Sequence, residues 1–242
     1  MALRPVVVDV NHADASHEEN GKIVDTIDFD AAYKWGIRGI VHKATEGEHF
    51  RDPLYASRRA KAIKAGMLWG AYHFERPGDV GGQVSSFLSA VGHQSDAQSP
   101  TYIMPPLPSP GLWVPNFVRL TLDFEDPKLG LWQAEHFLDI IHTVTQQYGW
   151  LYSGFLVREL LQKNGHDVDL EHYPLWLAEY STVAKVPKLW KNYVLWQRSG
   201  DGEGPGPHDI PGIGVKQDVD YFSGTDDELR AAWYGIAPTE VA

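Results

Sequence analysis

The chain alternates short apolar runs with amphipathic stretches along its first two thirds. Runs of β-branched and aromatic residues are typical of buried strands, and they occur at residues 6–10, 39–45, 68–74, 118–125 and 151–155. Segments with apolar residues at helical spacing follow most of them, at residues 29–35, 55–65, 80–91, 131–148 and 156–163. A strand followed by a helix, repeated along the chain, indicates a parallel sheet.

The last third departs from this alternation. Residues 175–180, 193–199 and 219–222 are typical of strands with little helix between them, and a short helix at 226–233 closes the pattern. We therefore expect an α/β fold, an irregular TIM-like (β/α) barrel with βα units in its first part and mostly β strands in its last third. Six prolines within residues 95–116 indicate a loop insertion, because proline interrupts helices and central strands. We expect residues 1–242 to form a single domain.

Composition narrows the choice of partners. The 242 residues carry a formal net charge of -11 without a basic block, so a nucleic-acid backbone is a poor partner. There is no cysteine, which excludes disulfides and thiolate metal sites. No run reaches the ~20 apolar residues of a membrane helix, and we see no signal peptide, since the apolar run near the start is short and broken by Asp9.

Two acids stand at the end of the fourth strand run. Side chains alternate in a strand, so Asp123 and Glu125 should point to the same side, with Cα atoms roughly 6.5–7 Å apart, while Phe124 points to the other. Charge repulsion and partial burial would raise the pKa of one acid and leave that of the other low. Such a pair is a proton donor beside a fixed negative charge.

Other acids also fall near strand ends. Asp9 closes the first strand run and Asp220 lies in the last, and these two strands would be neighbours in a closed barrel. The pair on strand four would then face them across the barrel mouth. A single acid at such a place often caps the following helix, but four that converge on one opening favour a catalytic site.

Short sequence motifs along nearly the whole chain resemble those of the glycoside hydrolase family 25 lysozymes, the Chalaropsis-type muramidases. They are Val7-Val8-Asp9-Val10, Ile27-Asp28-Phe29, Lys43-Ala44-Thr45-Glu46-Gly47 followed by Asp52, Gly70-Ala71-Tyr72-His73-Phe74, Gln83 with Phe87, Leu122-Asp123-Phe124-Glu125, Tyr152-Ser153, Trp176-Leu177-Ala178-Glu179-Tyr180, Leu195-Trp196-Gln197-Arg198-Ser199, and Val219-Asp220-Tyr221-Phe222-Ser223-Gly224. The last of these motifs is one residue shorter than the corresponding motif of the family. Asn11 in place of a serine, the long segment 12–26 and the insertion 95–116 also depart from the family pattern.

The resemblance implies a muramidase that cleaves the β-1,4 bond between N-acetylmuramic acid and N-acetylglucosamine in peptidoglycan. It implies catalysis by Glu125, Asp123, Asp9 and Asp220, with Glu125 as general acid and then base, and no cofactor or metal. The spacing of Asp123 and Glu125 leaves open a direct glycosyl-enzyme or a route through the substrate's acetamido group. We favour the second, with Asp123 stabilising an oxazolinium ion.

Aromatic residues near these strands are candidates for substrate binding. The resemblance favours Tyr72, Tyr152 and Trp176 as lining of the groove, and Tyr180 is a further candidate, although core packing is an alternative for each. Trp196 is evenly balanced between the two roles. Lys43 could contact a substrate carboxylate or make a structural ion pair.

Two other kinds of protein fit parts of the pattern. One is a cell-wall carbohydrate-binding barrel without turnover, although the intact acidic pair argues against it. The other is a metal-dependent barrel hydrolase that uses His12, His42 or His73 with the acids, although no metal-ligand spacing is present. The expected partner is the bacterial peptidoglycan glycan strand, without nucleic acid or membrane, and we expect a monomer. The site of action would be the bacterial cell wall, reached by phage-type endolysin release or by an export signal since removed.

Overall fold

A computed structural model describes residues 5–92, 117–164 and 168–235. The proline-rich insertion expected at residues 95–116 lies outside these ranges. None of the helices in the described ranges has the length and apolar character that crossing a bilayer needs.

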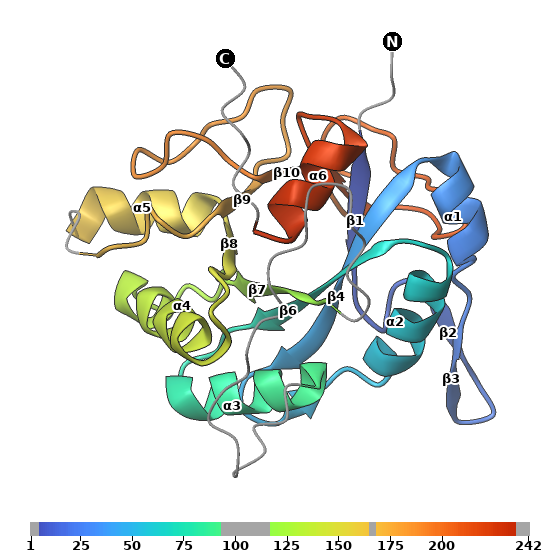
Figure 1. Ribbon diagram of the computed structural model, residues 1–242, viewed down its shortest axis with the longest axis horizontal. Coiled ribbons are helices and arrows are strands. Elements are labelled where there is room, and N and C mark those ends of the chain that lie inside the picture. Colours follow the sequence, from blue (N-terminus) through green and yellow to red (C-terminus); the bar gives the residue numbers. More distant parts are fainter. Residues whose placement is uncertain (1–4, 93–116, 165–167, 236–242) are drawn as a thin grey trace.

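Strands and helices follow one another in the order expected for the first part of the chain (Figure 1). The strands are β1 (Val6–Val10), β2 (Ser16–Glu19), β3 (Lys22–Asp25), β4 (Ile37–Glu46), β5 (Phe50–Arg51), β6 (Leu68–Phe74), β7 (Arg119–Asp123), β8 (Trp150–Ser153), β9 (Leu175–Ala178), β10 (Leu195–Ser199) and β11 (Asp218–Tyr221). The helices are α1 (Phe29–Trp35), α2 (Tyr55–Lys64), α3 (Val80–Val91), α4 (Leu131–Thr145), α5 (Phe155–Asn164) and α6 (Asp226–Trp233).

The main sheet closes into a barrel. Its strands follow the order β1-β11-β10-β9-β8-β7-β6-β4, and β4 pairs back with β1, while β5 is added to β4 as a short antiparallel strand. All pairs from β1 through β4 and β6 to β10 are parallel, but β11 is antiparallel to both of its neighbours. The irregular barrel with βα units first and strands later is confirmed.

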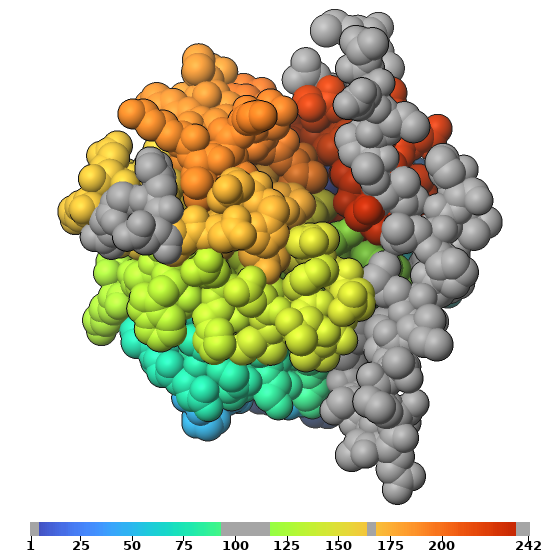
Figure 2. All heavy atoms as spheres, turned by 60° about the vertical axis from the view of Figure 1, so that its left-hand side comes forward, coloured from blue at the N-terminus to red at the C-terminus, as the bar shows by residue number. Residues whose placement is uncertain are grey.

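Because side chains alternate along each strand, the apolar residues form two clusters on opposite faces of the sheet. Leu120 and Leu122 on β7, and Phe124 directly after it, join the larger cluster between the sheet and the helices that surround it. Helices α3 and α4 lie next to each other on this outer layer (Figure 2). The inward residues form a second cluster, which includes Val7, Tyr72, Tyr152 and Trp176. Because the inner cluster fills the barrel, a site can form only at an open end.

Helix α6 closes the end opposite the parallel strands' carboxyl ends. Its Trp233 belongs to the inner cluster, and its indole donates to the Trp69 carbonyl oxygen at 3.1 Å. The buried guanidinium of Arg119, at the start of β7, donates through Nε to the Trp233 carbonyl oxygen at 2.6 Å. A Cβ on Gly70 would lie 3.2 Å from the Trp233 ring, so glycine permits this close packing. The remaining open end of the barrel is therefore the carboxyl end of its parallel strands.

A β-hairpin that the sequence analysis treated only as a long connection stands beside α2 (Figure 1). Strands β2 and β3 pair antiparallel from Ser16–Asp25 to Glu19–Lys22. The two residues of the turn, Asn20 and Gly21, both have positive φ, at 52° and 71°. Asn-Gly between two paired segments is the strongest short hairpin signal, and it was present in the sequence.

One buried acid lies directly after β6. Glu75 follows Phe74 and is fully buried, and neither carboxyl oxygen has a hydrogen-bond partner among the described residues. Removal from water raises its pKa from 4.5 to about 8. The folded protein therefore holds a proton on Glu75 that the unfolded chain releases above pH ~4.5.

We predict that Glu75 makes the protein less stable as the pH rises from about 4.5 to about 8. In this window the folded state binds one proton more than the unfolded state, so the free energy of unfolding falls, by up to about 1.4 kcal/mol per pH unit. The variants Glu75→Gln and Glu75→Met should flatten this slope, which urea unfolding at several pH values measures.

Glu19→Gln is the matched control, because Glu19 is exposed on the hairpin and the substitution makes the same change in charge. It should leave the slope as in the wild type. A Glu75→Gln protein whose stability still falls as steeply between pH 5 and 8 would contradict the prediction.

Candidate active site

The open end of the barrel gathers polar side chains from strands of both directions. For β1 and the strands parallel to it, this end lies at the last residues, where Asp9 and Asp123 stand. The antiparallel β11 enters the barrel at the same end, so its first residue, Asp218, lies there. The register places Asp9 directly opposite Asp218 and Val7 opposite Asp220.

Asp9 is held by a short chain of hydrogen bonds across the barrel. Its Oδ2 accepts from Nε2 of Gln197 at 2.7 Å, and Oε1 of Gln197 accepts from the Tyr152 hydroxyl at 2.6 Å. Burial and the neighbouring charges of Asp218 and Asp220 raise the pKa of Asp9 well above its ordinary value, although the Gln197 bond lowers it. The glutamine therefore orients this carboxyl without neutralising it.

Asp220 lies deeper than its expected place at the mouth. It is 0% exposed, and its Oδ1 accepts from the indole nitrogen of Trp176 at 2.6 Å. The expectation treated the last strand like the others, for which the mouth is at the carboxyl end. Because β11 runs the other way, moving along the strand from Asp218 to Asp220 leads into the barrel.

Asp218 is the carboxylate that the sequence reasoning missed. It is half-buried, and its Oδ1 accepts from the backbone N–H of Asp201 at 3.1 Å. Burial and the nearby charge of Asp201 raise its pKa from 3.8 to about 7. The signal was present in the sequence, since Asp218 and Asp220 alternate around Val219, but only the strand direction decides which of the two reaches the mouth.

Asp123 and Glu125 differ in their surroundings. Strand β7 ends at Asp123, which is buried, and its Oδ1 has no hydrogen-bond partner among the described residues. Glu125 follows the strand and is exposed at the rim, while Phe124 packs in the outer core, as the alternation predicted. Burial and the charge of Glu125 raise the pKa of Asp123 well above its usual range, and partial burial raises that of Glu125. The pair therefore retains a proton at a higher pH than free carboxyls would.

The aromatic candidates surround these acids. Tyr152 and Trp176 pack edge to face, with ring centroids 4.7 Å apart. Burial raises the pKa of Tyr152, and the charges of Glu125 and Asp9 raise it further, which places both acids near its hydroxyl. Tyr72 and Trp176 are buried in the inner cluster, whereas Tyr180 is 42% exposed. Tyr180 is therefore the candidate whose ring is accessible to a ligand. The other three, Tyr72, Tyr152 and Trp176, lie buried beneath the open end of the barrel.

Lys43 makes an ion pair. Its Nζ lies 2.5 Å from Oε2 of Glu46, and Arg76 binds the other oxygen of Glu46 and also Asp126, at 3.0 Å. Burial raises the pKa of Glu46, but the hydrogen bonds from Lys43 and Arg76 outweigh it and lower the pKa. The charges of Lys43 and Arg76 act to lower the pKa of Asp123 and that of Glu46 acts to raise it, so the two cations offset part of the crowding of acids on that side.

The three histidines considered as metal ligands lie apart from each other. His12 binds Asp52, His42 binds the Lys43 carbonyl and Arg58, and His73 binds Thr45 and Gln83. Burial lowers the pKa of both His42 and His73 to about 4, so these two are neutral. Within the described ranges, no three His, Asp or Glu residues are grouped so that they could hold a metal ion.

Comparisons with known proteins agree on one family. The family model described as glycosyl hydrolases family 25 matches residues 16–104. An N,O-diacetylmuramidase from Chalaropsis sp is 27% identical over 188 residues, which are 72% of this chain and 82% of the relative. The fold is similar to that of a bacterial lysozyme from Streptomyces coelicolor, with a TM-score of 0.70, 21% identity, and 98% and 100% of the two chains covered. It is also similar to a family GH25 lysozyme from Aspergillus fumigatus, with a TM-score of 0.67, 24% identity, and 96% and 99% covered.

We predict that Trp176→Phe destabilises the protein by about 1–3 kcal/mol, because it leaves the buried Asp220 carboxyl without its indole donor while keeping an aromatic ring beside Tyr152. The indole bond lowers the pKa of Asp220, so its loss raises that pKa further. The destabilisation should therefore grow as the pH rises through the range in which Asp220 ionises, and urea unfolding at a series of pH values measures it.

Trp196→Phe is the matched control. The Trp196 indole donates to the backbone carbonyl oxygen of Glu179 at 2.8 Å, and this acceptor does not titrate. Its loss should cost the same at every pH of the series. Equal pH dependence of the two variants would contradict the assignment of the Trp176–Asp220 bond.

Proposed function

This chain belongs to glycoside hydrolase family 25, and we propose that it is a muramidase that hydrolyses the β-1,4 bond between N-acetylmuramic acid and N-acetylglucosamine in peptidoglycan. The observation that carries the proposal is the open end of the barrel, where Asp123 and Glu125 face the Asp9–Asp218 pair. Acids with raised pKa values around an aromatic floor suit an oxocarbenium-like transition state.

Glu125 is the proposed general acid. It is exposed at the rim, where a substrate can reach it, and its raised pKa favours the protonated form that the first step needs. Glu125 would give its proton to the glycosidic oxygen as the bond to the sugar C1 breaks. As a carboxylate it would then take a proton from the water that attacks C1 in the second step.

Asp123 is the proposed partner of the substrate's acetamido group. Its buried Oδ1 lacks a donor among the described residues, and an amide N–H is a donor of the right chemistry. Donation from the amide would favour the ionised form of Asp123 and so leave the shared proton on Glu125. The acetamido oxygen would form the bond to C1, and Asp123 would stabilise the oxazolinium ion until water replaces that bond.

Asp9 and Asp218 would supply negative charge on the opposite side of the sugar. Asp218 takes the place at the mouth that the sequence reasoning assigned to Asp220, while Asp220 lies below and bonds to Trp176. Tyr180 would offer its exposed ring to a sugar, and Tyr72, Tyr152 and Trp176 would support the groove. Lys43, paired with Glu46, would lie within reach of a substrate carboxylate.

The protein would work as a single catalytic domain and a monomer at the bacterial cell wall, reached by phage-type release or by an export signal since removed. The test of the reaction is mass spectrometry of digested muropeptides, because a muramidase leaves N-acetylmuramic acid at the new reducing end. Binding to the wall without clearing a peptidoglycan suspension would favour a carbohydrate-binding barrel. Loss of activity in EDTA would favour a metal-dependent hydrolase.

We predict that Glu125→Gln lowers kcat by about 10² or more, because glutamine cannot transfer the proton. Its fold and its binding of glycan should be unchanged, since Glu125 lies at the exposed rim. Turbidity clearance and muropeptide release measure the effect. Glu48→Gln, at another exposed acid, is the control.

We predict that Asp123→Asn lowers kcat more than it raises KM, because the stabilisation of the positively charged oxazolinium is lost in the transition state. Steady-state kinetics on a defined glycan fragment measure both constants. Turnover near that of the wild type would remove Asp123 from this role. A covalent sugar adduct on Asp123, found by mass spectrometry with a slow fluoro-sugar substrate, would instead support the direct glycosyl-enzyme route.

A further inference from the structure

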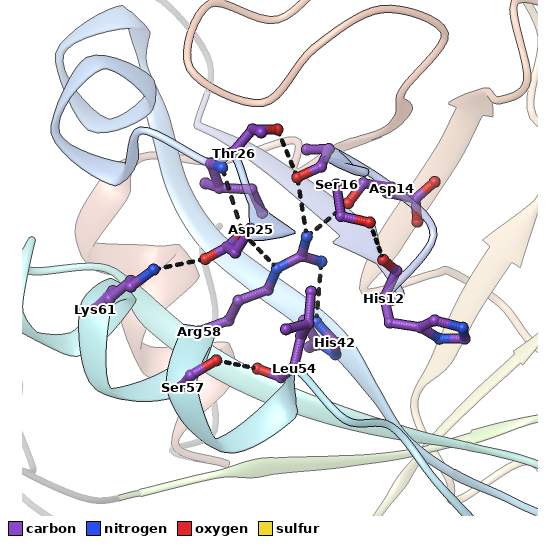
Figure 3. Close-up of polar contacts among 12 residues, drawn as sticks. His12, Asp14, Ser16, Asp25, Thr26, His42, Leu54, Ser57, Arg58 and Lys61 are labelled. Atoms are coloured by element: carbon purple, nitrogen blue, oxygen red, sulfur yellow. Dashed lines mark hydrogen bonds and ion pairs between the residues drawn. The ribbon is translucent and has the colours of Figure 1, made fainter. Parts of the chain in front are cut away.

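The hairpin β2–β3 and the turn before it are anchored to α2 by one buried arginine (Figure 3). Arg58 is 0% exposed. Its Nε donates to Oδ1 of Asp25 at 2.9 Å, its Nη1 donates to the Asn11 carbonyl at 2.7 Å, and its Nη2 donates to the Asp14 carbonyl at 2.6 Å and the Ala15 carbonyl at 3.2 Å. One side chain thus binds both the start and the end of the inserted segment.

The other neighbours of Arg58 help to fix its orientation. His42 Nδ1 bonds to the Lys43 carbonyl, so its neutral ring presents Nε2 as an acceptor, 3.3 Å from Nη1 of Arg58. Lys61, one turn further along α2, binds the second oxygen of Asp25 at 2.7 Å. Because the guanidinium is planar and rigid, these contacts set the place of the turn at residues 11–15 with little freedom.

The turn presents Asp14 to the barrel mouth. Oδ2 of Asp14 accepts from the Asn11 backbone N–H at 2.7 Å, and Oδ1 has no hydrogen-bond partner among the described residues. In Figure 3 the Asp14 side chain points away from the guanidinium that holds its backbone. The charge of Asp14 raises the pKa of Asp9, of Asp218 and of Tyr72, which places it near the acids of the mouth.

We propose that Asp14 is a further substrate-contacting residue of this active site, and that Arg58 is the residue that positions it. This inference rests on the proposed function. The free Oδ1 of Asp14 would accept a hydrogen bond from a sugar hydroxyl or amide N–H on the Asp9–Asp218 side of the groove. The same negative charge would disfavour a substrate carboxylate at that position.

Charged and titratable groups approach Asp14 from several elements. They are Asp9 on β1, Asp52 after β5, Arg58 on α2, Tyr72 on β6, Asp201 after β10 and Asp218 on β11. Burial raises the pKa of Asp14, the bond from Asn11 and the charge of Arg58 lower it, and Asp201 and Asp52 raise it, with a net rise. Because the charge of Asp14 raises the pKa of Asp9 and of Asp218, removing that charge should lower both pKa values.

The experiment compares Asp14→Asn and Asp14→Ala with Glu18→Gln. Glu18 is exposed on the same hairpin, and its substitution removes the same charge without a neighbour in the mouth. Asp14→Ala should raise KM about tenfold, the value of one hydrogen bond to a charged group, and change kcat little. Asp14→Asn should move the acid limb of the kcat/KM profile to lower pH, and Asp14→Glu should restore it. Glu18→Gln should change neither.

A second readout does not need turnover. Carboxyl carbon NMR should show the titration of Asp218, at about pH 7 in the wild type, moving to lower pH in Asp14→Asn and staying in Glu18→Gln. Arg58→Lys should speed hydrogen exchange in residues 11–26 and move the same titration in the same direction. If the wild type releases no muropeptides but the titration moves, the proposed function fails and the placement of Asp14 stands. An Asp14→Ala enzyme with unchanged KM, or an unmoved Asp218 titration in Asp14→Asn, overturns the inference.

Discussion

The antiparallel strand β11 is the constraint on which the rest of the site depends. It closes the barrel between β1 and β10 by backbone hydrogen bonds to both, and without it the sheet would have two open edges. Its direction also decides the chemistry of the mouth. A strand that enters at the rim brings its first inward residue, Asp218, beside Asp9 and leaves Asp220 below, where a hydrogen bond from Trp176 offsets part of the cost of burial.

On the β1–β11 side of the barrel, acids are stabilised by neutral hydrogen-bond donors. Asp9 and Asp220 are bound by neutral donors, Gln197 and Trp176, rather than by lysine or arginine. Neutral donors satisfy a carboxyl oxygen and leave its charge uncompensated, so repulsion and desolvation keep the pKa values high. The cost to stability falls at the end of the barrel where the proposed reaction needs protons and negative charge together.

Long-range anchoring shapes the rim on the hairpin side. Arg58 donates to backbone carbonyls at the start of the segment between β1 and α1 and to the Asp25 carboxylate near its end, and Nε2 of His42 also accepts from it. A buried guanidinium without these acceptors would cost several kcal/mol, so the helix and the hairpin depend on each other. Family resemblance could not have shown this, because the segment departs from the family pattern in length.

Local pattern in the sequence determined the βα units, the alternation of Asp123, Phe124 and Glu125, and the candidate aromatics, because these depend on spacing along one strand or helix. The hairpin with its turn at Asn20–Gly21 could also have been predicted from the sequence. Tertiary structure alone decided that β11 runs antiparallel, so that Asp218 and not Asp220 reaches the mouth, and that Trp176 turns its indole to a buried acid instead of an open groove. It also decided the partners of His73, which are Thr45 on β4 and Gln83 on α3. Strand direction and side-chain partners depend on residues far apart in the chain, and a single sequence carries no record of those distances.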